Sequence, residues 1–124
     1  MMVRRIIKGM VLGMILFTSC YYDVEEVLYP QGSCQTANMS LQANIQPILE
    51  RNCYVCHSTS TGVDNGNVIL EGYDNLKVYV DNGKLLGTIR HDNGFKPMPQ
   101  EASKLGDCDI AKIEQWIQDG ALNN

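Results

Sequence analysis

A length of 124 residues falls within the range of one domain, which argues against an enzyme built from two domains around a deep cleft. The 14 acidic and 10 basic residues give a net charge of −4 at pH 7. Nothing in the chain resembles the basic stripe that neutralises phosphates, so nucleic acid is not expected as a partner.

The first residues have the order of an export signal. Arg4, Arg5 and Lys8 precede an apolar stretch over residues 10–17, and small residues follow it. A basic segment followed by a short apolar one is typical of a signal peptide. A membrane-spanning helix needs about 20 apolar residues, more than this stretch provides. The sequence therefore predicts export rather than a transmembrane anchor.

The motif FTSC at residues 17–20 resembles the cleavage site of a bacterial lipoprotein signal. This resemblance implies that residues 1–19 are removed and that Cys20 becomes a lipid-carrying N-terminus, anchored to a membrane. Secretion without a lipid is the alternative. Removal of the signal leaves 7 basic and 14 acidic residues, a net charge of −7. Such a charge favours a partner with a basic docking patch, because complementary charge accelerates encounter.

The next segment, residues 20–39, is polar and shows no helical or strand period, so we expect a tether that becomes ordered near Cys34. A short helix should follow. Asn44 is a candidate cap, Ile45 and Leu49 lie on one face, and Pro47 is tolerated in a first turn. This helix leads the chain directly to Cys53.

Residues 58–72 are rich in Gly and Asn and are expected to form a loop. Asp74 would cap a short helix over residues 76–80, and a second short turn is expected over residues 85–89. Asp107 or Asp109 would start the most strongly amphipathic helix, which ends near Gly120. The elements together predict an all-α fold.

The motif Cys53-Tyr54-Val55-Cys56-His57 is the strongest chemical signal. A C-x-x-C-H spacing suits thioether bonds from both cysteines to haem vinyl groups, with the adjacent imidazole as an iron ligand. A thioredoxin-type dithiol is one alternative, but it should follow a strand in an α/β pattern. Half of a zinc site is another, but no second C-x-x-C or histidine pair is present.

With these motifs in view, residues 45–124 resemble the small monohaem cytochrome c family, in particular the lipoprotein-borne cytochrome domains of bacteria such as the Bacteroidetes. The resemblance is carried by three segments: ILERNCYVCH, FKPMPQ and IEQWIQDGA. It implies a small helical domain wrapped around one covalently bound haem c. The expected organisation is thus a signal at 1–19, a tether at 20–39 and a cytochrome domain at 40–124.

The family places a methionine in a proline-rich loop on the haem face opposite the histidine. Met98 matches this position, since it lies between Pro97 and Pro99. The flanking prolines restrict the backbone and would help to present its sulfur. His91 is the alternative sixth ligand, and an open or water-bound iron is a third possibility.

The resemblance and the position of the cysteines also predict a disulfide between Cys34, before the first helix, and Cys108, at the start of the last. An exported protein meets oxidising conditions, which favour such a bond. Two buried free thiols are the alternative. Arg90, Tyr73 and Tyr79 are candidate partners of the haem propionates.

Several apolar side chains and one aromatic one complete the expected pocket. The candidate walls of the haem pocket are Leu70, Leu76, Leu85, Leu86 and Ile89. Trp116 is expected to pack the last helix against the first.

The function predicted from the sequence is one-electron transfer by a membrane-anchored carrier with iron ligated by His57 and Met98, not enzymatic catalysis. A haem-based ligand sensor or a small peroxidase, with an open or His91-ligated distal site, is the alternative.

Overall fold

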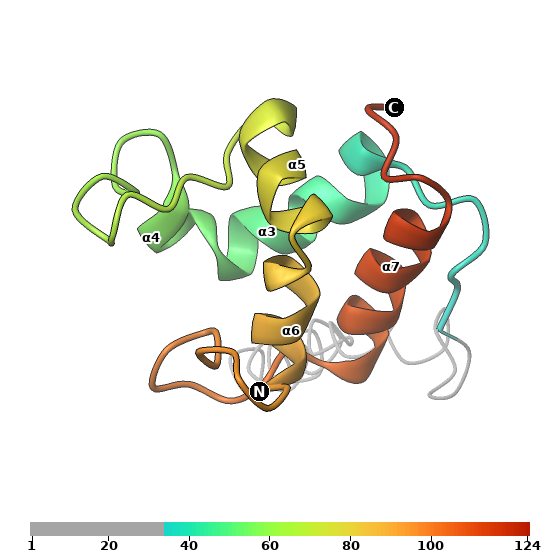
Figure 1. The fold of residues 1–124 in the computed structure, drawn as a ribbon. Helices are drawn as coiled ribbons and strands as arrows, with labels where there is room; N and C mark the ends of the chain where they lie inside the picture. Colours follow the sequence, from blue (N-terminus) through green and yellow to red (C-terminus); the bar gives the residue numbers. More distant parts are fainter. Residues whose placement is uncertain (1–33) are drawn as a thin grey trace, which may run out of the picture. The chain divides into compact units, whose positions relative to one another are not determined.

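The computed structural model describes residues 34–124, which form helices, turns and loops without a β-strand (Figure 1). For this part of the chain the predicted all-α class is confirmed. In chain order the helices are η2 (Leu41–Ile45), α3 (Gln46–Asn52), α4 (Tyr54–His57), α5 (Tyr73–Asp81), α6 (Lys84–Arg90) and α7 (Asp107–Gln118).

Helix formation begins earlier than the sequence pattern indicated. The Ser40 hydroxyl accepts a hydrogen bond from the Ala43 N–H and caps η2, a single π-helical turn that runs into α3. The cap predicted at Asn44 is wrong, because Asn44 lies inside this turn and its side-chain oxygen accepts from the Ser40 N–H. Pro47 lies in the first turn of α3, as predicted.

Two short helices, α5 and α6, follow the loop at residues 58–72. The residue that caps α5 is Gly72, with φ of 88°, and Asp74 lies in the first turn without a capping hydrogen bond. The cap predicted at Asp74 is therefore wrong, although the helix itself is confirmed. The turn expected over residues 85–89 is a helix, α6. It ends where His91 adopts a left-handed backbone with φ of 61°.

The last helix, α7, begins at Asp107 as predicted, and the chain leaves it through Gly120, whose φ is 100°. Its inner face is formed by Ile110, Ile113 and Trp116, all buried. Their spacing of three residues places the three side chains on one stripe. The periodicity of the sequence was therefore sufficient to predict both the helix and its buried face.

The core lies where α7 packs against η2 and α3. Four of its side chains are fully buried: Ile45, Leu49, Ile113 and Trp116. The Trp116 indole N–H donates to the Leu122 carbonyl. The chain end closes the same region, since the Gln42 N–H donates to the carbonyl of the final residue. The predicted packing of the last helix against the first is present.

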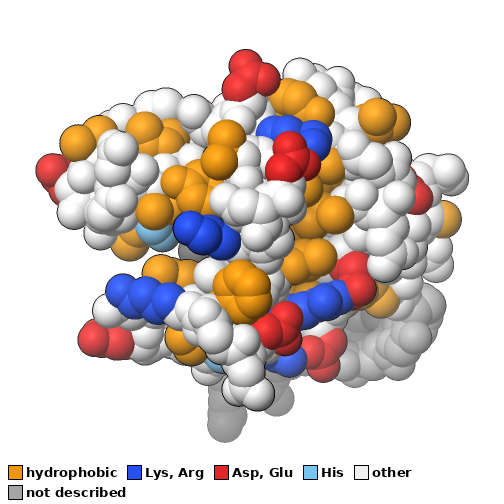
Figure 2. Space-filling view, viewed as in Figure 1, with side chains coloured by type: hydrophobic (Ala, Val, Ile, Leu, Met, Phe, Trp, Pro, Cys, Tyr) orange, Lys and Arg blue, Asp and Glu red, His pale blue; other side chains and the backbone are white. Residues whose placement is uncertain are grey.

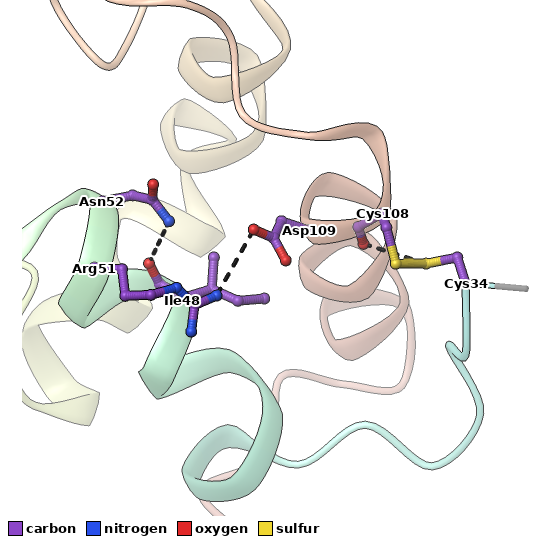
Figure 3. A network of polar contacts seen from close by, with 6 residues as sticks. All are labelled: Cys34, Ile48, Arg51, Asn52, Cys108 and Asp109. Carbon is purple, nitrogen blue, oxygen red and sulfur yellow. Dashed lines mark hydrogen bonds and ion pairs between the residues drawn. A yellow bond between two sulfur atoms is a disulfide. The ribbon is translucent and has the colours of Figure 1, made fainter. Parts of the chain in front are cut away.

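The segment before η2 is tied to the start of α7 (Figure 3). Cys34 and Cys108 are joined by a disulfide with a Cα–Cα distance of 5.5 Å. Near it, the Arg51 guanidinium on α3 lies 3.8 Å from the Asp109 carboxylate. Met39 is buried, and the compact unit starts at Cys34, before the boundary expected at residue 40.

No helix within residues 34–124 has the length and apolar character needed to span a bilayer. The signal at residues 1–19, the lipidation of Cys20 and most of the tether lie outside the described residues.

Candidate functional site

A cavity of about 580 Å³ lies between α4, α6 and the loops that follow them. In Figure 1 these loops, residues 58–72 and residues 91–106, project on the same side of the helices. Cys53, Cys56, His57 and Met98 all line the cavity. The structure thus brings together the four residues singled out in the sequence. The volume falls within the range of about 300–1,000 Å³ typical of ligand and cofactor pockets.

The backbone around α4 explains how three of these side chains share one cavity. The Cys56 and His57 N–H groups both donate to the Cys53 carbonyl, at 3.1 and 2.9 Å. Residues three and four apart in a helical turn lie on the same face. The C-x-x-C-H spacing in a helical conformation therefore directs both sulfurs and the imidazole to the same side.

His57 is held by the second half of the loop that follows it. The Nδ1 atom of His57 lies 3.0 Å from the Val68 carbonyl oxygen, and the Leu70 N–H donates to the His57 carbonyl at 2.8 Å. A carbonyl only accepts hydrogen bonds, so Nδ1 carries the proton. In the neutral imidazole, Nε2 then presents a free lone pair, as a metal-ligating histidine requires.

Gly62 allows this arrangement. A Cβ atom at position 62 would lie 2.5 Å from the Val68 carbonyl oxygen and 2.8 Å from the Ser58 carbonyl oxygen. Both contacts are with backbone atoms, which cannot move aside as a flexible side chain can. The absence of a side chain at Gly62 lets the turn after His57 close onto the carbonyl that orients its ring.

Met98 reaches the cavity from the loop between α6 and α7. Its N–H donates to the Thr88 carbonyl on α6 at 3.0 Å. His91, the alternative ligand, is not among the residues that line the cavity, and its Nε2 lies 3.1 Å from the Met98 carbonyl oxygen. In this structure Met98, rather than His91, lines the same cavity as the C-x-x-C-H motif.

The two cysteines of the motif are free thiols with different environments. Burial raises the pKa of the Cys53 thiol to about 11, whereas Cys56 is exposed. A thiol with a raised pKa is a poor source of thiolate at neutral pH. The environment of Cys53 is the reverse of that found at reactive dithiol sites.

Two basic side chains line the cavity, Lys84 and Lys96. Figure 2 shows a notch in the surface with Lys or Arg side chains on both of its edges. Within residues 34–124, neither lysine forms an ion pair with a carboxylate; the basic residues that do are Arg51, Lys77, Arg90 and Lys104. Two uncompensated positive charges therefore border a mainly apolar space. The sequence reasoning missed both, although Lys96 lies inside the FKPMPQ segment.

Two of the three residues proposed as propionate partners have other partners and do not line the cavity. Arg90 forms an ion pair with Glu114 on α7, and Tyr73 donates to the Ala121 carbonyl at 3.0 Å. Only Tyr79 lines the cavity.

The apolar walls match the expectation in part. Leu70, Leu85 and Ile89 line the cavity and are almost fully buried, whereas Leu76 and Leu86 do not line it. Val68 and Leu105 are additional apolar lining residues. Leu105 lies in a loop without periodicity, so no sequence pattern pointed to it.

In the part of the chain that the structure describes, no three His, Cys, Asp or Glu side chains come together as a cluster that would hold a metal ion. Comparison of the chain with protein-family models, with curated proteins and with solved structures finds no match.

Proposed function

We propose that this protein is a c-type cytochrome that transfers single electrons through one haem held in the cavity beside α4. The observation that carries the proposal is the meeting of four groups in one cavity: two thiols, an imidazole with a free Nε2 and a thioether. These are the groups that covalent attachment and axial ligation of a haem require. Haem supplies the Fe(II)/Fe(III) couple; the chain supplies attachment, ligands and surroundings.

Cys53 and Cys56 would make the covalent attachment. Each thiol would form one thioether bond by addition to a haem vinyl group, with the thiol hydrogen going to the second vinyl carbon. No external oxidant or reductant is consumed. The two thiols are free and line the cavity three residues apart on one helical face, which suits two neighbouring attachment points.

His57 and Met98 would supply the two protein ligands of the iron. The Val68 carbonyl keeps the proton on Nδ1 of His57, which leaves Nε2 as the ligand atom and strengthens it as a donor. A thioether as the second ligand favours a higher reduction potential and leaves no vacant position for oxygen or peroxide. These two ligands therefore favour a carrier rather than an enzyme.

Lys84 and Lys96 would neutralise the haem propionates. They are basic lining residues of the cavity, and within residues 34–124 neither has a carboxylate partner. Leu85, Ile89 and Leu105 would cover the apolar part of the ring. A pocket with apolar walls and charges at its edge matches the polarity of haem.

Other readings of the motif have less support. A reactive dithiol needs a lowered thiol pKa, whereas burial raises that of Cys53. A sensor or peroxidase with His91 on the distal side needs that imidazole in the cavity, whereas its Nε2 contacts the Met98 carbonyl.

The motifs at the N-terminus support an exported, lipid-anchored form of this carrier. Cys20 would hold it to a membrane outside the cytoplasm, and the net charge of −7 after signal removal favours a redox partner with a basic docking patch. Replacement of Cys20 by Ser should release the protein from the membrane fraction while leaving a covalently bound haem.

The proposal is tested by the mass of the protein matured in a bacterial periplasm. We expect one haem that survives denaturation in the wild type. Single replacement of Cys53 or Cys56 by Ala should leave at most one thioether bond, and the double variant should carry none. A wild-type protein without covalent haem would refute the proposal.

A further inference from the structure

We propose that His91 is a positioning residue that keeps the Met98 sulfur in the cavity by binding the Met98 carbonyl. This inference rests on the proposed function and deepens it, since it assigns His91 to positioning Met98 rather than to binding the iron.

The backbone of Met98 is held on both of its polar groups. Its N–H donates to the Thr88 carbonyl at 3.0 Å, and its carbonyl lies 3.1 Å from Nε2 of His91. Because a carbonyl only accepts, Nε2 of His91 is the donor. One partner lies in α6 and the other is the residue after it, so the Met98 peptide is attached to the end of that helix.

His91 is itself fixed at the end of α6. Its N–H donates to the Thr88 carbonyl at 3.3 Å, and its φ of 61° is in the left-handed region. Gly and Asn adopt that conformation more readily than other residues. A histidine here stops the helix and also places a ring whose nitrogen reaches the loop seven residues ahead. Neither Gly nor Asn has a side chain long enough for both tasks.

A second contact fixes the loop closer to its start. A Cβ atom at Gly87 would lie 2.6 Å from the Phe95 ring, so the ring occupies the space above this glycine. The Asp92 N–H also donates to the Gly87 carbonyl at 2.9 Å. The loop is thus anchored on α6 at Phe95 and again at Met98. Among these contacts, the hydrogen bond from His91 is the one that a side chain makes to Met98.

Competition with added imidazole measures how firmly Met98 is held. Imidazole binds the ferric protein only when the thioether leaves, so its apparent affinity rises as the hold on Met98 weakens. We compare wild type with His91→Ala and His91→Gln at one fixed pH. Gln carries an amide nitrogen that can replace the Nε2 donor, and both variants share the cost of a left-handed backbone.

The expected result is an apparent imidazole affinity about fivefold higher in His91→Ala, as loss of one hydrogen bond predicts, with His91→Gln returning to within about twofold of wild type. His91→Asn should resemble His91→Ala, because its amide is too short. It adopts the left-handed backbone readily and so provides the same test should His91→Ala fold poorly.

The Met98→Ala background shows whether His91 affects imidazole binding through Met98. There, His91→Ala should change imidazole affinity no further, because no thioether remains to be displaced. An imidazole affinity that is unchanged in His91→Ala would overturn the inference, and so would an equal rise in affinity in the Met98→Ala background. The proposed function would still stand in either case, provided that the wild type carries covalent haem and shows the thioether band. Absence of covalent haem from the wild type would refute both.

Discussion

Nδ1 of His57 lies 3.0 Å from the carbonyl oxygen of Val68, a residue in the second half of the loop that follows the C-x-x-C-H motif. The relationship couples the ring orientation of His57 to the closure of that loop. Gly62, at the turn within the loop, leaves just enough space for the Val68 carbonyl to approach. The geometry of the candidate iron ligand therefore depends on Gly62, a residue that does not line the cavity.

Replacement of Gly62 by Ala should disturb this geometry. The new Cβ would meet the Val68 and Ser58 carbonyls, and overpacking of this kind costs about 2 kcal/mol. We expect a lower free energy of unfolding in urea and a lower yield of covalent haem. Gly106→Ala is the matched control, because a Cβ there meets nothing within 4 Å. Equal losses in the two variants would show that Gly62 has no special role.

The cavity lysines should raise the reduction potential. A positive charge near the haem favours the reduced state, which carries one positive charge fewer. Replacement of Lys84 or Lys96 by Met should therefore lower the midpoint potential by about 20 mV each, with a smaller effect at high salt. Lys112→Met, a change of the same charge at a residue that does not line the cavity, is the control. Potentials that fall equally in all three variants would contradict an effect specific to the cavity.

The ion pair between Arg90 and Glu114 joins α6 to α7 and should make stability depend on pH. The hydrogen bond from Arg90 lowers the pKa of Glu114 below its ordinary value of 4.5. Because the folded pKa is the lower one, the contribution is present above pH 4.5 and is lost as pH falls through the folded pKa. Glu114→Gln should therefore be less stable than wild type near neutrality, and this difference should shrink in acid.

The control for this experiment is Glu101→Gln, which removes a carboxylate that forms no ion pair within residues 34–124. Its difference from wild type should show no comparable acid dependence. A gap between wild type and Glu114→Gln that stays constant down to pH 3 would argue against the ion pair.

The disulfide between Cys34 and Cys108 should resist alkylation unless the protein is first reduced. It closes a long loop between residues 74 positions apart, so its loss should lower the free energy of unfolding by up to about 4 kcal/mol. Cys34→Ser, Cys108→Ser and the double variant should be equally destabilised, because each removes the same bond. Thiols that react at both positions without reduction would contradict the assignment.

The sequence allowed prediction of those elements whose cause is local. The apolar spacing of Ile110, Ile113 and Trp116 predicted α7, and the C-x-x-C-H spacing predicted that its three side chains face one side. The helix caps were predicted less well. Ser40 rather than Asn44 caps the first turn, because an upstream π-helical turn extends the helix toward the N-terminus.

Some features of the site depend on contacts between segments that are distant in the sequence, and no sequence pattern predicted them. The pairing of Arg90 with Glu114 on another helix removes Arg90 from the role expected near the haem. Lys84 acquires a place on the cavity only because α6 packs beside the loop that carries Met98. The function of His91 as a partner of the Met98 carbonyl likewise depends on how the chain turns after α6.

The proposed ligation of one covalently attached haem by His57 and Met98 can be checked in the optical spectrum of the periplasmically matured protein. The oxidised wild type should show the long-wavelength band of thioether ligation, and its reduced form should leave carbon monoxide unbound. In Met98→Ala the band should vanish and carbon monoxide should bind. A wild type that lacks the band, or a Met98→Ala variant that retains it, would contradict the account.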